Sequence, residues 1–357
     1  MTTKGKHDFQ FLKQKKPWNE DPNPIWLAST ISLQRNVEKF NFPGKLSTDR
    51  KQQIVGLICQ KMLSIEGLTN PTFIKAEDIG LIEKEFIVEH FLSTHGYKEA
   101  FKGEGFIFDD SGEFLAILNV RDHIHMQLID CTGELENTWS RLVKIETTLG
   151  KSLNYAFLPK FGFLTADPTE CGTGLLATVY LQLSTLIHTG KIEEILDKYL
   201  DESLHVSGLQ GSPTEIIGDI LMIRNNYTFG VTEESIISSL RAVTTKLIVE
   251  EHSMRNKIKK EGNIDFKDKI SRAYGILIHS YQIEAIEALN ALSLIKLGVE
   301  MNWITQIDNR QINELFFNCR RAHLLCLCNE EKIDNVELAH KRAEMIHKAL
   351  KKVKLEI

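Results

Sequence analysis

The sequence contains no apolar run of about 18 residues, the length that spans a bilayer. It also has no cysteine framework, because its six cysteines are scattered over 357 residues, and this favours a reducing compartment. Residues 1–16 carry five lysines but no apolar segment, so they do not have the pattern of a secretory signal. We therefore expect a cytoplasmic protein without membrane contact.

A strong excess of one charge is absent as well. The net charge is −5 and 25% of the residues are charged, which argues against a general nucleic-acid binder. The chain is long enough for two domains, or for one large and one small domain.

Hydrophobic patterning predicts a mixed α+β chain. Residues 1–24 are polar, basic and closed by prolines, so we expect a flexible tail. Alternating or short apolar runs predict strands, and apolar residues at helical spacing predict helices. The expected strands are 25–33, 105–108, 114–119, 123–129, 156–157, 161–165 and 220–224, and the expected helices are 47–63, 83–92, 134–149, 191–200 and 233–252.

The stretch 165–178 organises the middle of the chain. Its Gly172-Thr173-Gly174 turn is expected to open a helix with Leu175, Val179, Leu183 and Ile187 on one face. Glycines at a helix start expose backbone N–H groups and make an anion site, although many helices begin in this way and bind nothing.

The C-terminal part is expected to be helical. Charge and turn residues gather at 257–263, which we take as a domain boundary. Beyond it, one helix carries apolar residues on most of its surface and the last helix carries one apolar stripe, so we expect residues 262–357 to form a dimerisation domain. The residues concerned are Ile286, Leu289, Leu292, Ile295 and Val299, then Ala339, Ala343, Ile346 and Leu350.

Several motifs resemble those of the ATP:guanidino phosphotransferases, the phosphagen kinases, and most closely their protein-arginine kinase branch of McsB type. They occur in the right order from about residue 25 to 350: Ala28–Asn36, Asn119–His123, Gly162–Leu175, Val206–Ser212 and Arg272–Leu277. The resemblance implies an antiparallel sheet backed by helices in a domain at 25–258, with a small helical N-terminal part to about 100. It also implies the C-terminal helical domain.

The chain departs from this family where the family binds ATP. Five arginines that hold the nucleotide phosphates there are replaced by Thr30, Ser32, His125, Leu176 and Ser207. Arg35 is kept, and a structural ion pair is the simpler account of it. The family cysteine two residues after Thr165 is Asp167 here.

The acid/base positions have also changed. Where the family has a Glu pair that holds the guanidinium, this chain has Val120 and Arg121, and Ser212 replaces the acidic residue of the closing loop. We therefore expect no catalytic residue and no bound cofactor. His123-Ile124-His125 and Cys326-Leu327-Cys328 lack further ligands at metal spacing, so we expect no metal.

These departures lead to three hypotheses. The first is a catalytically inactive kinase-like protein that acts as a binding partner or scaffold. It would form a homodimer or bind a zinc-finger activator protein (McsA-like), the type of protein that binds protein-arginine kinases. The second is an active kinase with a rebuilt pocket, which would need ATP and Mg²⁺. The third is a reader of phosphoarginine that uses Arg342, since the segment Leu338–Ala343 keeps half of the family's R-D-x-x-R-A motif.

Overall fold

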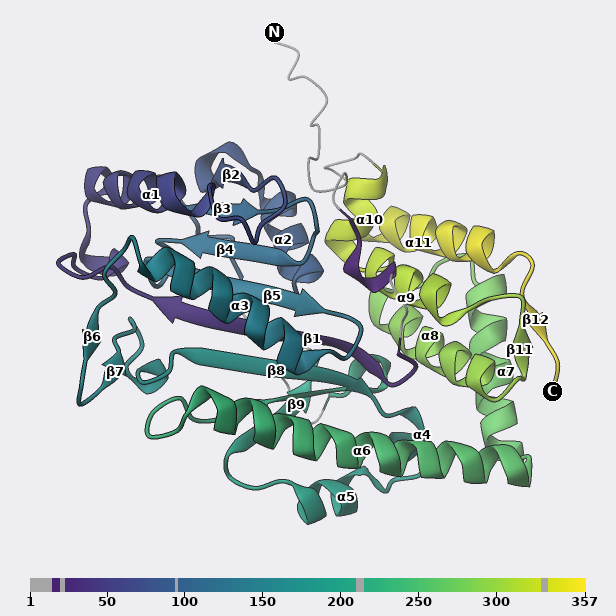
Figure 1. Ribbon diagram of the computed structural model, residues 1–357. Coiled ribbons are helices and arrows are strands. Elements are labelled where there is room, and N and C mark those ends of the chain that lie inside the picture. The colour runs from purple at the N-terminus through teal and green to yellow at the C-terminus, as the bar shows by residue number, and fades with distance from the viewer. Residues whose placement is uncertain (1–14, 20–22, 94–95, 210–214, 329–332) are drawn as a thin grey trace, which may run out of the picture.

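The computed structural model describes residues 15–19, 23–93, 96–209, 215–328 and 333–357. An eight-stranded antiparallel sheet forms the body of the molecule, and the C-terminal helices gather beside it (Figure 1). The strand order is β2-β3-β4-β5-β1-β8-β10-β9, where the strands are β1 (Trp26–Arg35), β2 (Thr72–Lys75), β3 (Gly105–Phe108), β4 (Phe114–Leu118), β5 (Ile124–Asp130), β8 (Leu175–Gln182), β9 (Leu204–Gly208) and β10 (Ile220–Asn225). This confirms the α+β class predicted from the sequence.

Strand β1 lies in the middle of the sheet and pairs with β5 on one side and β8 on the other. All ten of its residues are buried. The N-terminal 100 residues therefore do not form a small helical part of their own, because they supply this central strand and β2 to the main sheet.

The helix expected after Gly174 is wrong, because Leu175–Gln182 is strand β8. Nearly all its residues are buried, so they lack the polar–apolar alternation of a half-exposed strand, and spacing alone cannot distinguish such a run from a helix. The turn's N–H groups are used within the protein: the Gly172 N–H donates to Phe163 and that of Thr173 to Thr228, at 3.2 and 2.9 Å. The expected helix-terminal anion site therefore does not exist.

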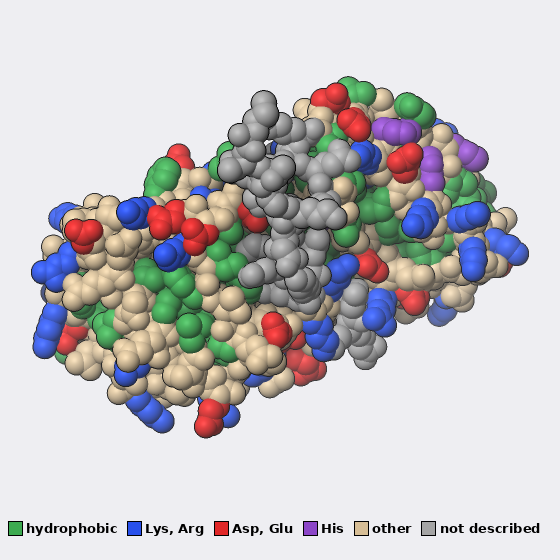
Figure 2. Space-filling view, turned by 90° about the horizontal axis from the view of Figure 1, so that it is seen from above, with side chains coloured by type: hydrophobic (Ala, Val, Ile, Leu, Met, Phe, Trp, Pro, Cys, Tyr) green, Lys and Arg blue, Asp and Glu red, His purple; other side chains and the backbone are tan. Residues whose placement is uncertain are grey.

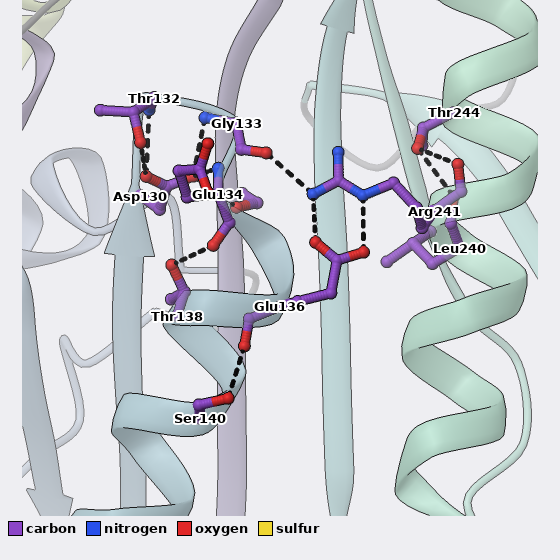
Figure 3. Close-up of polar contacts among 11 residues, drawn as sticks. Asp130, Thr132, Gly133, Glu134, Glu136, Thr138, Ser140, Leu240, Arg241 and Thr244 are labelled. Carbon is purple, nitrogen blue, oxygen red and sulfur yellow. Dashed lines mark hydrogen bonds and ion pairs between the residues drawn. The ribbon is translucent and has the colours of Figure 1, made fainter.

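Helices α1 (Thr48–Met62), α3 (Leu135–Gly150) and α6 (Glu233–Glu261) pack in one apolar cluster with residues of the sheet. Helix α1 begins after Ser47, whose hydroxyl accepts from the Arg50 N–H, as the sequence predicted. Arg241 of α6 ties the group together by donating to both carboxylate oxygens of Glu136 in α3 and to the Gly133 carbonyl (Figure 3). Short helices α4 (Ser184–His188) and α5 (Ile192–Tyr199) join the same layer.

The C-terminal helices share a second apolar cluster with α2 (Leu81–His90) and the other side of the sheet. They are α7 (Ile264–His279), α8 (Ala285–Glu300), α9 (Asn309–Asn318), α10 (Arg321–Cys328) and α11 (Asn335–Leu350), with the small pair β11 (Ile304–Thr305) and β12 (Lys354–Leu355). Helix α6 runs to Glu261 and ends at Gly262 in the left-handed conformation, inside the segment where we placed a boundary.

A buried carboxylate fastens α10 to α2. Glu89 accepts from the N–H groups of Ala322 and His323 and from His323 Nδ1 at 2.9–3.2 Å. These bonds lower the pKa of Glu89 against the opposing effect of burial. A negative charge at the start of α10 also matches the positive end of that helix.

The tail expected at 1–24 is wrong for its described part, residues 15–19. Trp18 is only 1% exposed and stacks on Phe317 of α9, with ring centroids 3.8 Å apart. Lys16 forms an ion pair with Glu314 of the same helix. This short stretch is therefore part of the interface between body and C-terminal helices.

No helix within the described ranges is long and apolar enough to cross a membrane. On the face seen from above, basic and acidic side chains are interspersed over both the body and the C-terminal helices (Figure 2).

We predict that acid weakens this interface through His90. Burial lowers the pKa of His90 to about 3, and its Nε2 lies 2.8 Å from the Gly112 carbonyl. Between pH 6.5 and 3 the unfolded chain binds a proton that the folded chain refuses, so the free energy of unfolding should fall as pH falls, by about 1.4 kcal/mol per pH unit. Urea denaturation from pH 7 to 5 measures this slope.

The matched variants are His90→Gln and His252→Gln, the latter at an exposed position on α6. His90→Gln should reduce the slope of the free energy of unfolding against pH, and His252→Gln should leave that slope unchanged. An unchanged slope in His90→Gln would contradict this assignment.

Candidate functional site

Four of the five positions that replace family arginines come together on one part of the sheet. Thr30, Ser32, His125 and Leu176 line a cavity of about 20 Å³, together with Leu92, Ser93, Tyr97, Gln127, Thr178 and Arg224. The register explains this, since Thr30 lies opposite Thr178 and Ser32 opposite Leu176. A cavity of this size has room for about one water molecule.

Two hydroxyls in this cavity, those of Thr30 and Ser32, have partners in the protein. Thr30 hydrogen-bonds to the Tyr180 hydroxyl, which donates to the Leu92 carbonyl at 2.9 Å. Ser32 Oγ donates to the Leu176 carbonyl at 3.3 Å. Both residues are buried, so these bonds satisfy polar groups that water does not reach.

The residues that match the family motifs hold the backbone around this cavity. Arg35 is 3% exposed; its Nε donates to Glu146 at 2.7 Å and its Nη1 to the Gln34 and Thr173 carbonyls. The guanidinium also lies 3.5 Å from the centre of the Phe163 ring. This confirms the structural ion pair expected of Arg35.

Asn36, Asp122 and His123 join three loops. Asn36 donates to Asp122 and to the Leu164 carbonyl, and Asp122 also accepts from the Ala166 N–H at 2.7 Å. His123 lies one residue before β5, although we expected the strand to begin with it. Its Nδ1 accepts from the Val37 N–H and its Nε2 lies 3.0 Å from the Asn41 carbonyl, while burial lowers its pKa to about 4.

Two of the departures from the family pattern meet in space. Arg121, at an acid/base position, donates to Asp167, at the family cysteine position, with Nη2 3.2 Å from Oδ2. Glu170 lies 3.8 Å from the same nitrogen. The side chains of Arg121 and Asp167 are both more than one third exposed, so this pair is worth little as stabilisation. Val120, the neighbouring acid/base position, is a partly buried apolar residue.

The remaining predicted positions lie elsewhere. Ser207 is on β9, opposite Met222 of β10, and lines a second cavity on the same sheet. Ser212 lies outside the described residues. Arg342 is 2% exposed, and its guanidinium donates to the Cys319 and Ile283 carbonyls at 2.7 and 2.8 Å. That geometry gives Arg342 a structural role and disfavours a contact with a partner protein.

Within the described ranges, no three His, Cys, Asp or Glu side chains are grouped so as to hold a metal ion.

The expected positions do not include two basic residues that line the second cavity. Arg224 of β10 and Arg320, between α9 and α10, are its two guanidinium groups. Arg224 is preceded by four apolar residues of a strand, and that isolated charge was its signal in the sequence. Arg320 has no such signal, since its approach to the sheet depends on how the C-terminal helices pack.

The fold is that of the phosphagen kinases. The chain is similar to the duplicated taurocyamine kinase of Schistosoma mansoni with bound transition-state-analogue components, with a TM-score of 0.57 and 23% identity over 70% of this chain. It spans about a third of that protein, 36% of its length. It is also similar to a lombricine kinase, with a TM-score of 0.57 and 20% identity over 70% of this chain and 72% of that one.

Sequence comparison shows to which branch of the phosphagen kinase family the chain belongs. Residues 54–254 match the model of the ATP:guanido phosphotransferase C-terminal catalytic domain, and residues 263–356 match that of the protein-arginine kinase McsB C-terminal domain. The protein-arginine kinase of Halothermothrix orenii is 34% identical over 90% of this chain and 92% of its own length. That of Chlamydia pneumoniae is 33% identical, over 94% and 95%. The chain therefore belongs to the ATP:guanido phosphotransferase family, in its protein-arginine kinase branch.

We predict that restoring a cation at Leu176 destabilises the protein. Leu176→Arg would place a guanidinium in a cavity with room for about one water and already lined by Arg224. Overpacking and a poorly solvated charge should lower the free energy of unfolding by about 1–3 kcal/mol. Urea midpoints of the wild type and the variant measure this.

Leu176→Met is the matched control, since it conserves volume and should cost less than about 1.5 kcal/mol. Equal midpoints for wild type and Leu176→Arg would show that the site is open to water. A rise of the variant's midpoint with millimolar Mg·ATP would show that a nucleotide site survives and lacks only its cation.

Proposed function

We propose that this chain is a catalytically inactive member of the protein-arginine kinase branch that acts as a binding partner or scaffold. The observation that carries the proposal is the ion pair between Arg121 and Asp167. In the family, these two positions belong to the pocket for the substrate guanidinium. Here a guanidinium of the chain itself is already paired there.

The loss of cations supports the same conclusion. Phosphoryl transfer depends on positioning and on neutralising charge around the transferred group. Each charge-assisted hydrogen bond contributes roughly 1.5–3 kcal/mol, whereas a nucleotide held at about 0.1 mM has only about 5–6 kcal/mol of binding free energy to lose. The cavity lined by four of the five altered positions has a volume of about 20 Å³, and the fifth, Ser207, lines an adjoining cavity of about 340 Å³.

The alternative is an active kinase with a rebuilt pocket. The curated relatives are named protein-arginine kinases, which favours it. Arg224 and Arg320 offer two cations at new positions. The phosphoarginine reader is less favoured, because the Arg342 guanidinium is engaged by backbone carbonyls.

We propose a homodimer assembled through the C-terminal helices, with a zinc-finger activator protein as a further candidate partner. Three large apolar residues of this region are more than 60% exposed: Ile264, Tyr281 and Val336. Ile264 is the first residue of α7, Tyr281 follows the end of that helix and Val336 lies in α11, and a contact between two copies would cover such side chains.

The nucleotide test separates the two main candidates. Calorimetric titration with Mg·ATP and Mg·ADP should give no binding heat at millimolar concentration, and labelled ATP with an arginine-rich protein should give no acid-labile label. The reason is that the family's nucleotide cations are absent and the guanidinium pocket is filled. A dissociation constant below about 1 mM would sink the inactive-kinase proposal and support the rebuilt pocket.

The assembly test is independent of nucleotide. Light scattering on the full chain at micromolar concentration should give about twice the monomer mass of 40.8 kDa. The exposed apolar side chains of the C-terminal helices supply the driving force. A monomeric mass under these conditions would refute the homodimer.

A further inference from the structure

A third cavity lies where the body meets the C-terminal helices. It has a volume of about 710 Å³, within the range of small-molecule sites. Its walls come from α4, from the segment just before β10, and from α7 and α8, which Figure 1 shows in the C-terminal region. None of the altered family positions in the described part of the chain lines it. Its apolar lining includes Ile187, Ile216, Ala273, Ile276, Ile286 and Leu294.

A buried carboxylate lines the cavity among these apolar side chains. Asp219 is 7% exposed; the Ser293 hydroxyl donates to its Oδ2 at 2.6 Å, and His188 Nε2 lies 3.3 Å from its Oδ1. Among the described residues, no lysine or arginine forms an ion pair with Asp219. A carboxylate offers roughly four acceptor sites, so this one can accept a further donor from a ligand in the cavity.

The backbone holds this carboxylate in place from both sides of the junction. Gly218 and Asp219 both have the left-handed conformation, with φ of 66° and 55°, which is uncommon for a residue other than glycine. The Gly218 N–H donates to Asn290 of α8 at 2.7 Å, and the Leu183 N–H donates to the Asp219 carbonyl at 2.9 Å. The carboxylate is therefore positioned before any ligand arrives, which lowers the entropic cost of binding.

The charges that line the cavity favour a cationic ligand. Its two basic side chains have partners on their own helix, α7: Lys269 Nζ lies 5.4 Å from the centre of the Phe266 ring, and Arg272 Nε lies 2.8 Å from Asp268. Glu287 of α8 also lines the cavity and forms no ion pair within the described part of the chain. Negative charge thus remains available to a ligand at Glu287 and Asp219, and at Asp219 burial strengthens its effect.

We propose that this cavity binds a small amphipathic amine, whose apolar body lies against the isoleucines and Leu294 and whose protonated amino group donates to Asp219. The charge-assisted hydrogen bond gives such a ligand its advantage over a neutral or anionic molecule of the same shape. The site goes beyond the proposed function, because it does not depend on whether the chain binds nucleotide or transfers a phosphoryl group.

Three probes with the same alkyl chain test the proposal: octylamine, octan-1-ol and octanoate. Calorimetric titration of the full chain at pH 7 should show one site for octylamine, with a dissociation constant of about 1 mM or tighter, because the chain is buried and the amine is paired. Octan-1-ol should bind about 10–100-fold more weakly, since it lacks the charged donor, and octanoate more weakly still.

Asp219→Asn removes the charge and keeps a residue type that tolerates the left-handed conformation. It should weaken octylamine binding by about 10–100-fold and leave octan-1-ol binding within about 2-fold of the wild type. Asp197→Asn, at an exposed position on α5, is the matched control and should bind all three probes like the wild type.

A second variant tests the apolar wall, and its folding is less at risk because Ile286 is 40% exposed. Ile286→Gln should weaken octylamine and octan-1-ol binding alike, by about 3–10-fold, because apolar contact is lost. Its matched control is Val249→Gln, at a position on α6 that is 62% exposed and outside the cavity.

Several results would overturn the proposal. They are the absence of octylamine binding at about ten times the expected constant, equal affinity for octylamine and octan-1-ol, and wild-type affinity in Ile286→Gln. If Asp219→Asn is folded by its melting curve, an unchanged preference for octylamine would overturn it as well. Competition between Mg·ATP and octylamine would place the amine in another pocket and would also overturn it.

Discussion

The burial of β1 on both faces limits the charge that the centre of the sheet can hold. All ten of its residues are buried, so an unpaired cation on this strand would carry a large desolvation cost. Thr30 and Ser32 avoid that cost because their hydroxyls bond to Tyr180 and to the Leu176 carbonyl. Thr30 and Ser32 are therefore satisfied by the protein itself, without a ligand.

The C-terminal helices also contribute to the second cavity on the sheet. Their core is continuous with one side of the sheet, and Glu89 and Trp18, both from the N-terminal part of the chain, contact α10 and α9 respectively. The turn between α9 and α10 thereby brings Arg320 to the sheet. Positive charge has not vanished from this face; it lies at Arg224 of β10 and at Arg320 beside the C-terminal helices, which are less deeply buried than β1.

The sequence was sufficient for the family, the fold class and most elements, because helix caps and turn residues between short apolar runs are local signals. Ser47 at the start of α1 and the turn between β3 and β4 are examples. It failed at Leu175–Gln182, where burial on both faces removes the alternation. It also failed at Trp18, whose partner Phe317 lies some 300 residues away.

The sequence predicted which positions of the candidate site lie together, but not the contacts that their side chains make. Five altered positions were assigned to one pocket, and the structure brings four of them together in one cavity. The pairing of Arg121 with Asp167 and the approach of Arg320 depend on tertiary contacts. Complementary charges at two motif positions were visible in the sequence, but nothing local indicated that their side chains meet.

The ion pair between Arg121 and Asp167 also bears on how this lineage can evolve. Changing Arg121 alone to the family glutamate would place three acidic groups together, since Asp167 and Glu170 both lie within 4 Å of the guanidinium that would be lost. Changing Asp167 alone to cysteine would leave an arginine in the substrate pocket, still held by Glu170. Each single reversal is unfavourable by itself, so positions 121 and 167 are coupled: a change at one of them favours a compensating change at the other.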